Sequence, residues 1–190
     1  KMDIDIFEVI RCASTKPFGF STFYPGPGLG GHCIPIDPYY LSWKAKEFDF
    51  STKFIELAGE INSNMPFWVV NKIIENLNSK GKSIKSSKIL VLGLTYKKNV
   101  NDLRESPSIK IINILKNYKP NLYFHDPFFK FNFKKIKFFK LDYEKIKSFD
   151  CTIILTDHDC YNYKKIFDNS KMILDSRGRF SSKSQKIKII

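Results

Sequence analysis

The second half of the chain alternates strand-like apolar runs with helical patterns, and this alternation constrains the fold more than any other feature. Strands are predicted over residues 88–94 (KILVLGL), 122–124 (LYF), 151–155 (CTIIL) and 171–175 (KMILD). Ser106 and Pro107 begin a predicted helix, because serine suits the N-cap and proline the first helical position. Another helix is predicted over about 161–167. The pattern predicts an α/β fold with a mostly parallel sheet.

Ligands of such sheets bind beyond the carboxyl ends of the strands. The chemistry is therefore expected at residues 95–104, Asp126, residues 156–159 and Ser176-Arg177. Residues 96–107 bring two lysines and an arginine to a helix N-terminus, so this stretch is either a pyrophosphate site or a solvated charged loop. Neither the G-x-G-x-x-G fingerprint nor the P-loop pattern is present.

The first half is predicted to be helical. Helices are expected over residues 3–12, about 38–48 and 52–80, where apolar residues recur at helical spacing. Pro66 should kink the long helix or start a new turn, and Gly81 should end it. The apolar stripe of this helix indicates either core packing or a subunit interface.

Between the first two helices lies a run of four glycines and two prolines, residues 24–31 (YPGPGLGG), followed at once by His32-Cys33. Such a run is either a flexible linker or a loop that lies close against a ligand. The apolar and aromatic residues 34–41 favour the second interpretation. Cys33 is then either a nucleophilic thiol or a small buried hydrophobe. Asp37 could handle protons, and His32, in an extended segment, should point away from Cys33.

Composition narrows the class of function. The formal charge of +13 comes from 28 lysines and only four arginines, spread over the chain, so nucleic acid is not expected as a partner. The cysteines at positions 12, 33, 151 and 160 lack the spacing of a zinc or thioredoxin site. No metal is therefore expected, and reduced thiols suggest the cytoplasm. No apolar run is long enough to span a membrane, so no membrane partner is expected.

Two motifs together resemble those of the nucleotide-sugar 6-dehydrogenases, the UDP-glucose/GDP-mannose dehydrogenase family. They are residues 23–41 (FYPGPGLGGHCIPIDPYYL), and GLTYK at 93–97 with LRESPS at 103–108. The GHCIPIDPYYL form is similar to the branch that acts on UDP-N-acetylhexosamines, with UDP-glucose as the less favoured substrate. The resemblance implies a helical central dimerisation region over 1–81 and a Rossmann-like UDP-binding domain over 82–190. The family's N-terminal NAD-binding domain is then absent.

The resemblance also implies roles for individual residues. Cys33 is expected to be the catalytic thiol that carries C6 of the sugar as a thioester, and Asp37 to assist water or proton transfer. Cys33 and Arg104 are expected to face NAD, with Arg104 at its phosphates. The expected substrate contacts are Tyr24, Gly26, Gly28, Leu29, Gly30, Tyr96, Lys97 and Arg177.

The partners implied by the resemblance are a UDP-sugar, NAD as cofactor and a second copy of the chain, bound through residues 52–80. Without the NAD-binding domain, we expect the chain to be inactive alone. The alternative is a non-catalytic remnant of the same ancestry that binds a UDP-sugar or dimerises.

Overall fold

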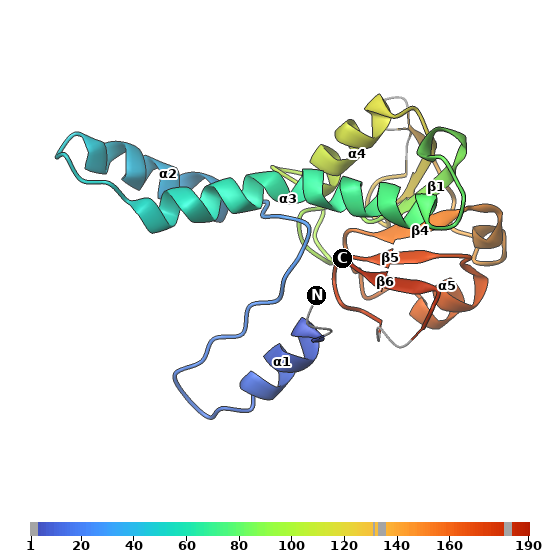
Figure 1. Cartoon of the computed structure of the whole chain (residues 1–190), viewed down its shortest axis with the longest axis horizontal. Helices are drawn as coiled ribbons and strands as arrows, with labels where there is room; N and C mark the ends of the chain where they lie inside the picture. Colours follow the sequence, from blue (N-terminus) through green and yellow to red (C-terminus); the bar gives the residue numbers. More distant parts are fainter. Residues whose placement is uncertain (1–3, 131, 133–135, 181–183) are drawn as a thin grey trace.

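The computed structural model describes residues 4–130, 132, 136–180 and 184–190. Figure 1 shows an α/β domain, a helical hairpin that projects from it, and a separate N-terminal helix joined to the hairpin by a long extended segment. The helices of the first half are α1 (Ile6–Ala13), α2 (Cys33–Lys46) and α3 (Lys53–Asn78). The predicted fold class, helical first and then α/β, is confirmed.

The α/β domain holds one sheet of six strands in which every ladder is parallel. Its strands are β1 (Lys88–Leu92), β2 (Asn121–His125), β3 (Lys137–Phe138), β4 (Cys151–Ile154), β5 (Ile173–Asp175) and β6 (Ile187–Ile189). Its helices are α4 (Pro107–Asn117), α5 (Tyr163–Asn169) and the 3-10 helices η1 (Ile84–Ser86) and η2 (Glu144–Ser148). The order across the sheet is β3-β2-β1-β4-β5-β6, which is the doubly wound order of Rossmann folds.

The sheet is buried on both faces because successive residues of a strand point to opposite sides. In β1, Ile89 and Val91 pack into a core with α3 and α4, while Leu90 and Leu92 pack into a second core with α5 and η2. All four side chains are fully buried. This explains why residues 89–92 form a continuous apolar run instead of an alternating one. The short edge strands β3 and β6 were not predicted, because two or three residues carry too little pattern.

The apolar stripe of α3 divides into two parts. In its C-terminal half, Val69, Ile73 and Leu77 are buried in the core shared with α4, as core packing predicts. In its N-terminal half, Phe54 and Leu57 are exposed, and this half forms the projecting hairpin with α2 (Figure 1). The helix continues unbroken through the buried Pro66, which therefore does not begin a new helix. In the described ranges, no helix combines the length and apolarity needed to cross a bilayer.

Helix α2 begins at Cys33, five residues before the predicted start near Pro38. Pro35 lies in the first turn, where a missing N–H costs no intrahelical hydrogen bond. Pro35 and Pro38 made the segment look irregular and hid this helix start. The earlier start matters for the chemistry, since Cys33 and Asp37 are one helical turn apart and share a face.

Helix α1 is capped by Asp5, whose carboxylate accepts a hydrogen bond from the Phe7 N–H at 2.9 Å. Phe7 is its one buried residue and packs against Gly178 in the loop after β5. The Phe7 ring also stacks on Tyr24, with the ring centroids 6.3 Å apart. The predicted helix over 3–12 is present in the described residues, and residue 3 lies outside them. Phe7 thereby connects α1 to residues 24–31, the glycine-rich segment.

Candidate active site

The loops that were expected to carry chemistry meet at one edge of the sheet. Because every strand is parallel, the residues after β1, β2, β4 and β5 all emerge on the same side. The strand order reverses between β1 and β4, so the loops starting at Thr95 and Thr156 flank the point where doubly wound sheets bind ligands. Backbone and side-chain contacts join these loops into one unit.

The centre of this unit is the buried carboxylate of Asp126. It accepts hydrogen bonds from the backbone N–H groups of Leu94 at 2.7 Å, Thr95 at 3.3 Å and Phe128 at 2.9 Å. Burial alone would raise the pKa of Asp126, but the hydrogen bonds from His158, Leu94 and Phe128 outweigh it and lower the pKa below its ordinary value. Asp126 thus joins the end of β2 to the loop that follows β1.

His158 is fully buried and holds the same loop from the other side. Its Nδ1 accepts the backbone N–H of Asn99 at 3.0 Å, so the ring hydrogen lies on Nε2 in this arrangement. Nε2 lies 3.2 Å from Asp126 Oδ2 and 3.2 Å from Thr95 Oγ1. The imidazole therefore bridges the loops after β1, β2 and β4.

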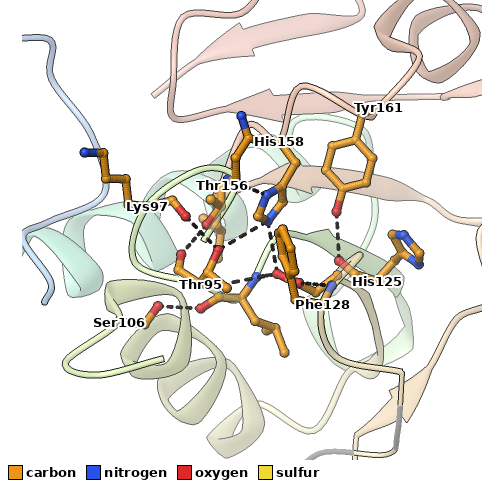
Figure 2. A network of polar contacts seen from close by, with 12 residues as sticks. Thr95, Lys97, Ser106, His125, Phe128, Thr156, His158 and Tyr161 are labelled. Carbon is orange, nitrogen blue, oxygen red and sulfur yellow. Dashed lines mark hydrogen bonds and ion pairs between the residues drawn. The ribbon is translucent and has the colours of Figure 1, made fainter. Parts of the chain in front are cut away.

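Hydroxyl groups complete the network (Figure 2). Thr156 Oγ1 donates to the Thr95 carbonyl at 2.6 Å, and Thr95 Oγ1 donates to the Lys97 carbonyl at 2.9 Å. Ser106 was predicted to cap α4, and it does occupy the N-cap position. However, its hydroxyl makes no capping bond and instead donates to the Leu94 carbonyl at 2.6 Å. The result is a fixed turn over residues 95–99 from which the exposed Lys97 side chain points away from the network.

The glycine-rich segment lies directly against this edge. A Cβ at Gly30 would lie 2.6 Å from Tyr96 Cβ and 3.0 Å from the Glu105 carbonyl oxygen. The next residue, Gly31, donates its N–H to the Arg104 carbonyl at 2.9 Å. The segment is therefore bound to the α/β domain and is not a flexible linker. Gly30 is required by close approach to the protein's own side chains, a reason that the sequence did not reveal.

Arg177 connects the other end of the segment to the site. Its Nε donates to the Leu155 carbonyl at 2.7 Å, and a Cβ at Gly26 would lie 2.7 Å from Arg177 Nη1. Burial lowers the pKa of the Arg177 guanidinium, while the charges of Asp157 and Asp175 act in the opposite direction. Arginine keeps its charge in proteins, so Arg177 brings a fixed positive charge to this edge.

The Cys33 thiol is exposed at the first residue of α2. One side-chain donor or acceptor atom from each of His32, Cys33 and Asp37 lies within 4.8 Å of the other two. The expectation that His32 points away from Cys33 is therefore wrong. It assumed an extended backbone, whereas His32 is the N-cap residue of a helix and its ring lies beside the thiol.

Arg104 is exposed and pairs with Asp102, with Nη2–Oδ2 at 2.7 Å and Nε–Oδ2 at 2.9 Å. These hydrogen bonds, and then the charges of Asp102, Tyr96 and Cys33, raise the pKa of Arg104 above its ordinary value. The same hydrogen bonds lower the pKa of Asp102. Asp102 thus holds the Arg104 guanidinium in place, and its exposure leaves it accessible to an anionic ligand.

The predicted site residues lie in several elements. Tyr96, Lys97 and Arg104 lie in the loop after β1, and Arg177 lies after β5. Gly28 and Leu29 line a mostly apolar cavity of about 360 Å³ between α2, α3 and the start of α4. Tyr24 is exposed and packs on Phe7. Cys33, Lys97 and Arg177 do not line that cavity.

Sequence reasoning missed the role of His158. The region 156–159 was expected to carry chemistry, but nothing distinguished a buried histidine there from an exposed one. Glu105 was also missed, and it adopts a left-handed backbone with φ of 48°. Such strained residues gather at functional sites. A non-glycine residue in this conformation is not recognisable from its sequence.

Comparisons with known proteins place the chain in one family. Residues 1–64 match the model of the "UDP-glucose/GDP-mannose dehydrogenase family, central domain", and residues 90–182 match that of the same family's "UDP binding domain". A UDP-N-acetyl-D-mannosamine dehydrogenase from Methanococcus maripaludis is 35% identical over 85% of this chain. A UDP-N-acetyl-D-glucosamine 6-dehydrogenase from Salmonella typhi is 34% identical over 67% of it.

A solved structure, a UDP-D-ManNAc dehydrogenase from Pyrococcus horikoshii, superposes over 97% of this chain with a TM-score of 0.80 and 28% identity. The chain spans only part of these proteins. It covers 35% of the Methanococcus protein, 29% of the Salmonella protein and 43% of the Pyrococcus structure.

Proposed function

Because this chain belongs to the UDP-glucose/GDP-mannose dehydrogenase family, we propose that it forms the central and UDP-binding parts of an NAD-dependent UDP-sugar 6-dehydrogenase. One observation carries the proposal. The glycine-rich segment before Cys33 is bound to the loop after β1 through a hydrogen bond from the Gly31 N–H to the Arg104 carbonyl, although these residues lie far apart in the sequence. That contact brings a nucleophilic thiol and a set of cationic side chains to one ligand-binding edge.

We assign the nucleotide end of the substrate to the region of Lys97 and Arg177. Lys97 and Arg177 extend from loops after β1 and β5, and both can bind phosphate oxygens. The network around Asp126 and His158 holds the backbone of the Lys97 turn before any ligand arrives. Such preorganisation lowers the entropic cost of binding. The glycine-rich segment, with Tyr24, Gly26 and Gly30, then lies between the nucleotide end and the thiol.

The chemical end is assigned to Cys33. Its thiolate would attack the C6 aldehyde of the sugar, forming a C–S bond while the carbonyl oxygen takes up a proton to give a thiohemiacetal. After oxidation to the thioester, water would attack the carbonyl carbon and the C–S bond would break, returning the thiolate and releasing a carboxylate. Asp37, on the same helical face as Cys33, is placed to accept the proton of that water.

NAD, when bound, would accept the hydride in both oxidations, that of the C6 alcohol to the aldehyde and that of the thiohemiacetal to the thioester. In this chain Arg104 fits a role at its phosphates, because the guanidinium is exposed beside the thiol and carries a permanent charge. The relatives named above support a UDP-N-acetylhexosamine as substrate, and we propose this class for the present chain.

We also propose that a second copy of the chain covers the projecting hairpin. Its exposed apolar side chains include Tyr40, Leu41 and Trp43 on α2, and Phe54, Leu57 and Ile61 on α3. Many large apolar side chains left exposed on one projecting element favour an interaction surface there. The molar mass in solution, measured by light scattering, should be twice the 22.2 kDa of one chain, and a single-chain mass would contradict this proposal.

Binding of a UDP-sugar to this chain tests the proposed function. At a concentration one hundred times its Kd, UDP-N-acetylglucosamine should stabilise the fold by about 2.7 kcal/mol, which thermal melting detects. Lys97→Gln should weaken binding about tenfold, as expected for loss of one charge-assisted contact. Lys85→Gln is the matched control, because Lys85 is exposed in η1, before β1, at the opposite edge of the sheet. No stabilisation at millimolar UDP-sugar would refute the proposal.

A further inference from the structure

His32 and Cys33 lie together at the N-terminus of α2, and the function proposed above leaves His32 unused. We propose that His32 is the proton acceptor of the Cys33 thiol. Atoms of the two side chains, and of Asp37, lie within 4.8 Å of one another, and all three residues are exposed. A small rotation about side-chain bonds can close this separation, and catalytic hydrogen bonds are often long before a ligand binds. The inference rests on the proposed role of Cys33 as the nucleophile.

The charges that surround the thiol favour this role. The N-terminus of α2 carries a partial positive charge beside Cys33. From the loop after β1, Arg104 and Tyr96 face the same region, and Asp102 holds Arg104 in place. Asp37 adds a carboxylate one helical turn from Cys33. A proton that leaves the thiol therefore has an imidazole within reach.

The proton transfer has a clear place in the reaction. The S–H bond of Cys33 breaks, and its proton moves to a ring nitrogen of His32, leaving a thiolate and an imidazolium. When the thiolate attacks the aldehyde, the new alkoxide takes a proton, and the imidazolium is placed to supply it. His32 is then neutral again. The step needs no co-reactant, and an imidazole commonly exchanges protons near neutral pH.

The test is the pH dependence of Cys33 alkylation by iodoacetamide, followed for each cysteine by peptide mass spectrometry on the full chain. His32→Gln keeps the size and polarity of the side chain but cannot accept the proton. We expect it to slow Cys33 alkylation at pH 7 about tenfold, and to leave the rate at pH 9.5 nearly unchanged, because the thiol ionises there unaided. A purely structural role of His32 would change both rates equally.

The chain contains its own controls. Cys12 and Cys160 are exposed and distant in sequence, so the variant should leave their alkylation rates unchanged. Cys151 is buried in the core, and its protection reports that the variant is folded. If Cys151 becomes reactive, His32→Asn replaces the first variant, since asparagine is a favoured N-cap residue. An unchanged ratio of the pH 7 and pH 9.5 rates at Cys33 would overturn the inference. That result would not bear on UDP-sugar binding, which the Lys97 experiment measures separately.

Discussion

Gly93→Ala is expected to lower the free energy of unfolding by about 3–5 kcal/mol. Gly93 follows β1 with a φ of 87°, which an L-residue adopts only with strain. A Cβ there would lie 2.5 Å from the Thr156 carbonyl oxygen and 2.7 Å from Thr156 Cα. Both neighbours are backbone atoms of the adjacent loop, so they cannot rotate away. Chemical denaturation followed by circular dichroism measures the change.

Gly81→Ala is the matched control for this prediction. Gly81 also has a positive φ, 69°, but nothing lies within 4 Å of the position a Cβ would take. The free energy of unfolding of Gly81→Ala should fall by only about 1 kcal/mol, because alanine adopts a positive φ less readily than glycine. If the two variants lose the same stability, then the close approach of the loops after β1 and β4 does not require a glycine at position 93, and this explanation is wrong.

Asp126→Asn is expected to lower the free energy of unfolding by about 2–4 kcal/mol. In the native protein Oδ2 receives the N–H groups of Leu94 and Thr95 and faces His158, and Oδ1 receives the N–H of Phe128. An amide must place its own NH₂ group toward one of these sets of donors. A buried donor then loses its acceptor, whichever way the amide is turned. Asp168→Asn, on the exposed side of α5, should change stability by less than about 0.5 kcal/mol.

The same carboxylate makes a pH-dependent contribution. The folded pKa of Asp126 is lowered, so its stabilisation is complete above the pKa of the unfolded chain, about 4, and is lost as the pH falls through the folded value. The stability gap between the native chain and Asp126→Asn should therefore be constant from pH 7 to about pH 5 and close below about pH 4. A gap that is independent of pH would contradict an ionised Asp126.

The sequence predicted most of the α/β domain because its signals are local. Residues 89–92 are apolar throughout because both faces of the central strand are covered, and this was evident from the residues alone. Residues 137–138 and 187–189 are too short to carry such a pattern. They become strands through pairing with β2 and β5, which is a tertiary effect.

The roles proposed for Cys33, Lys97 and Arg177 stay predictions, but their local geometry can be compared with the structure. The sequence placed Cys33 in an extended segment because prolines follow it, whereas Cys33 begins α2. Once the helix begins at Cys33, His32 and Asp37 become its neighbours. The burial of His158 could not be predicted either, since it depends on Asp126 and Asn99 arriving from other loops.

In the proposed function, a UDP-sugar lies along the glycine-rich segment with its sugar at Cys33. The alkylation rate of each cysteine, in the presence and absence of saturating UDP-N-acetylglucosamine, tests this placement. We expect Cys33 to be protected at least about tenfold, while the exposed Cys12 and Cys160 react at unchanged rates. Equal rates at Cys33 with and without the bound nucleotide sugar would contradict it.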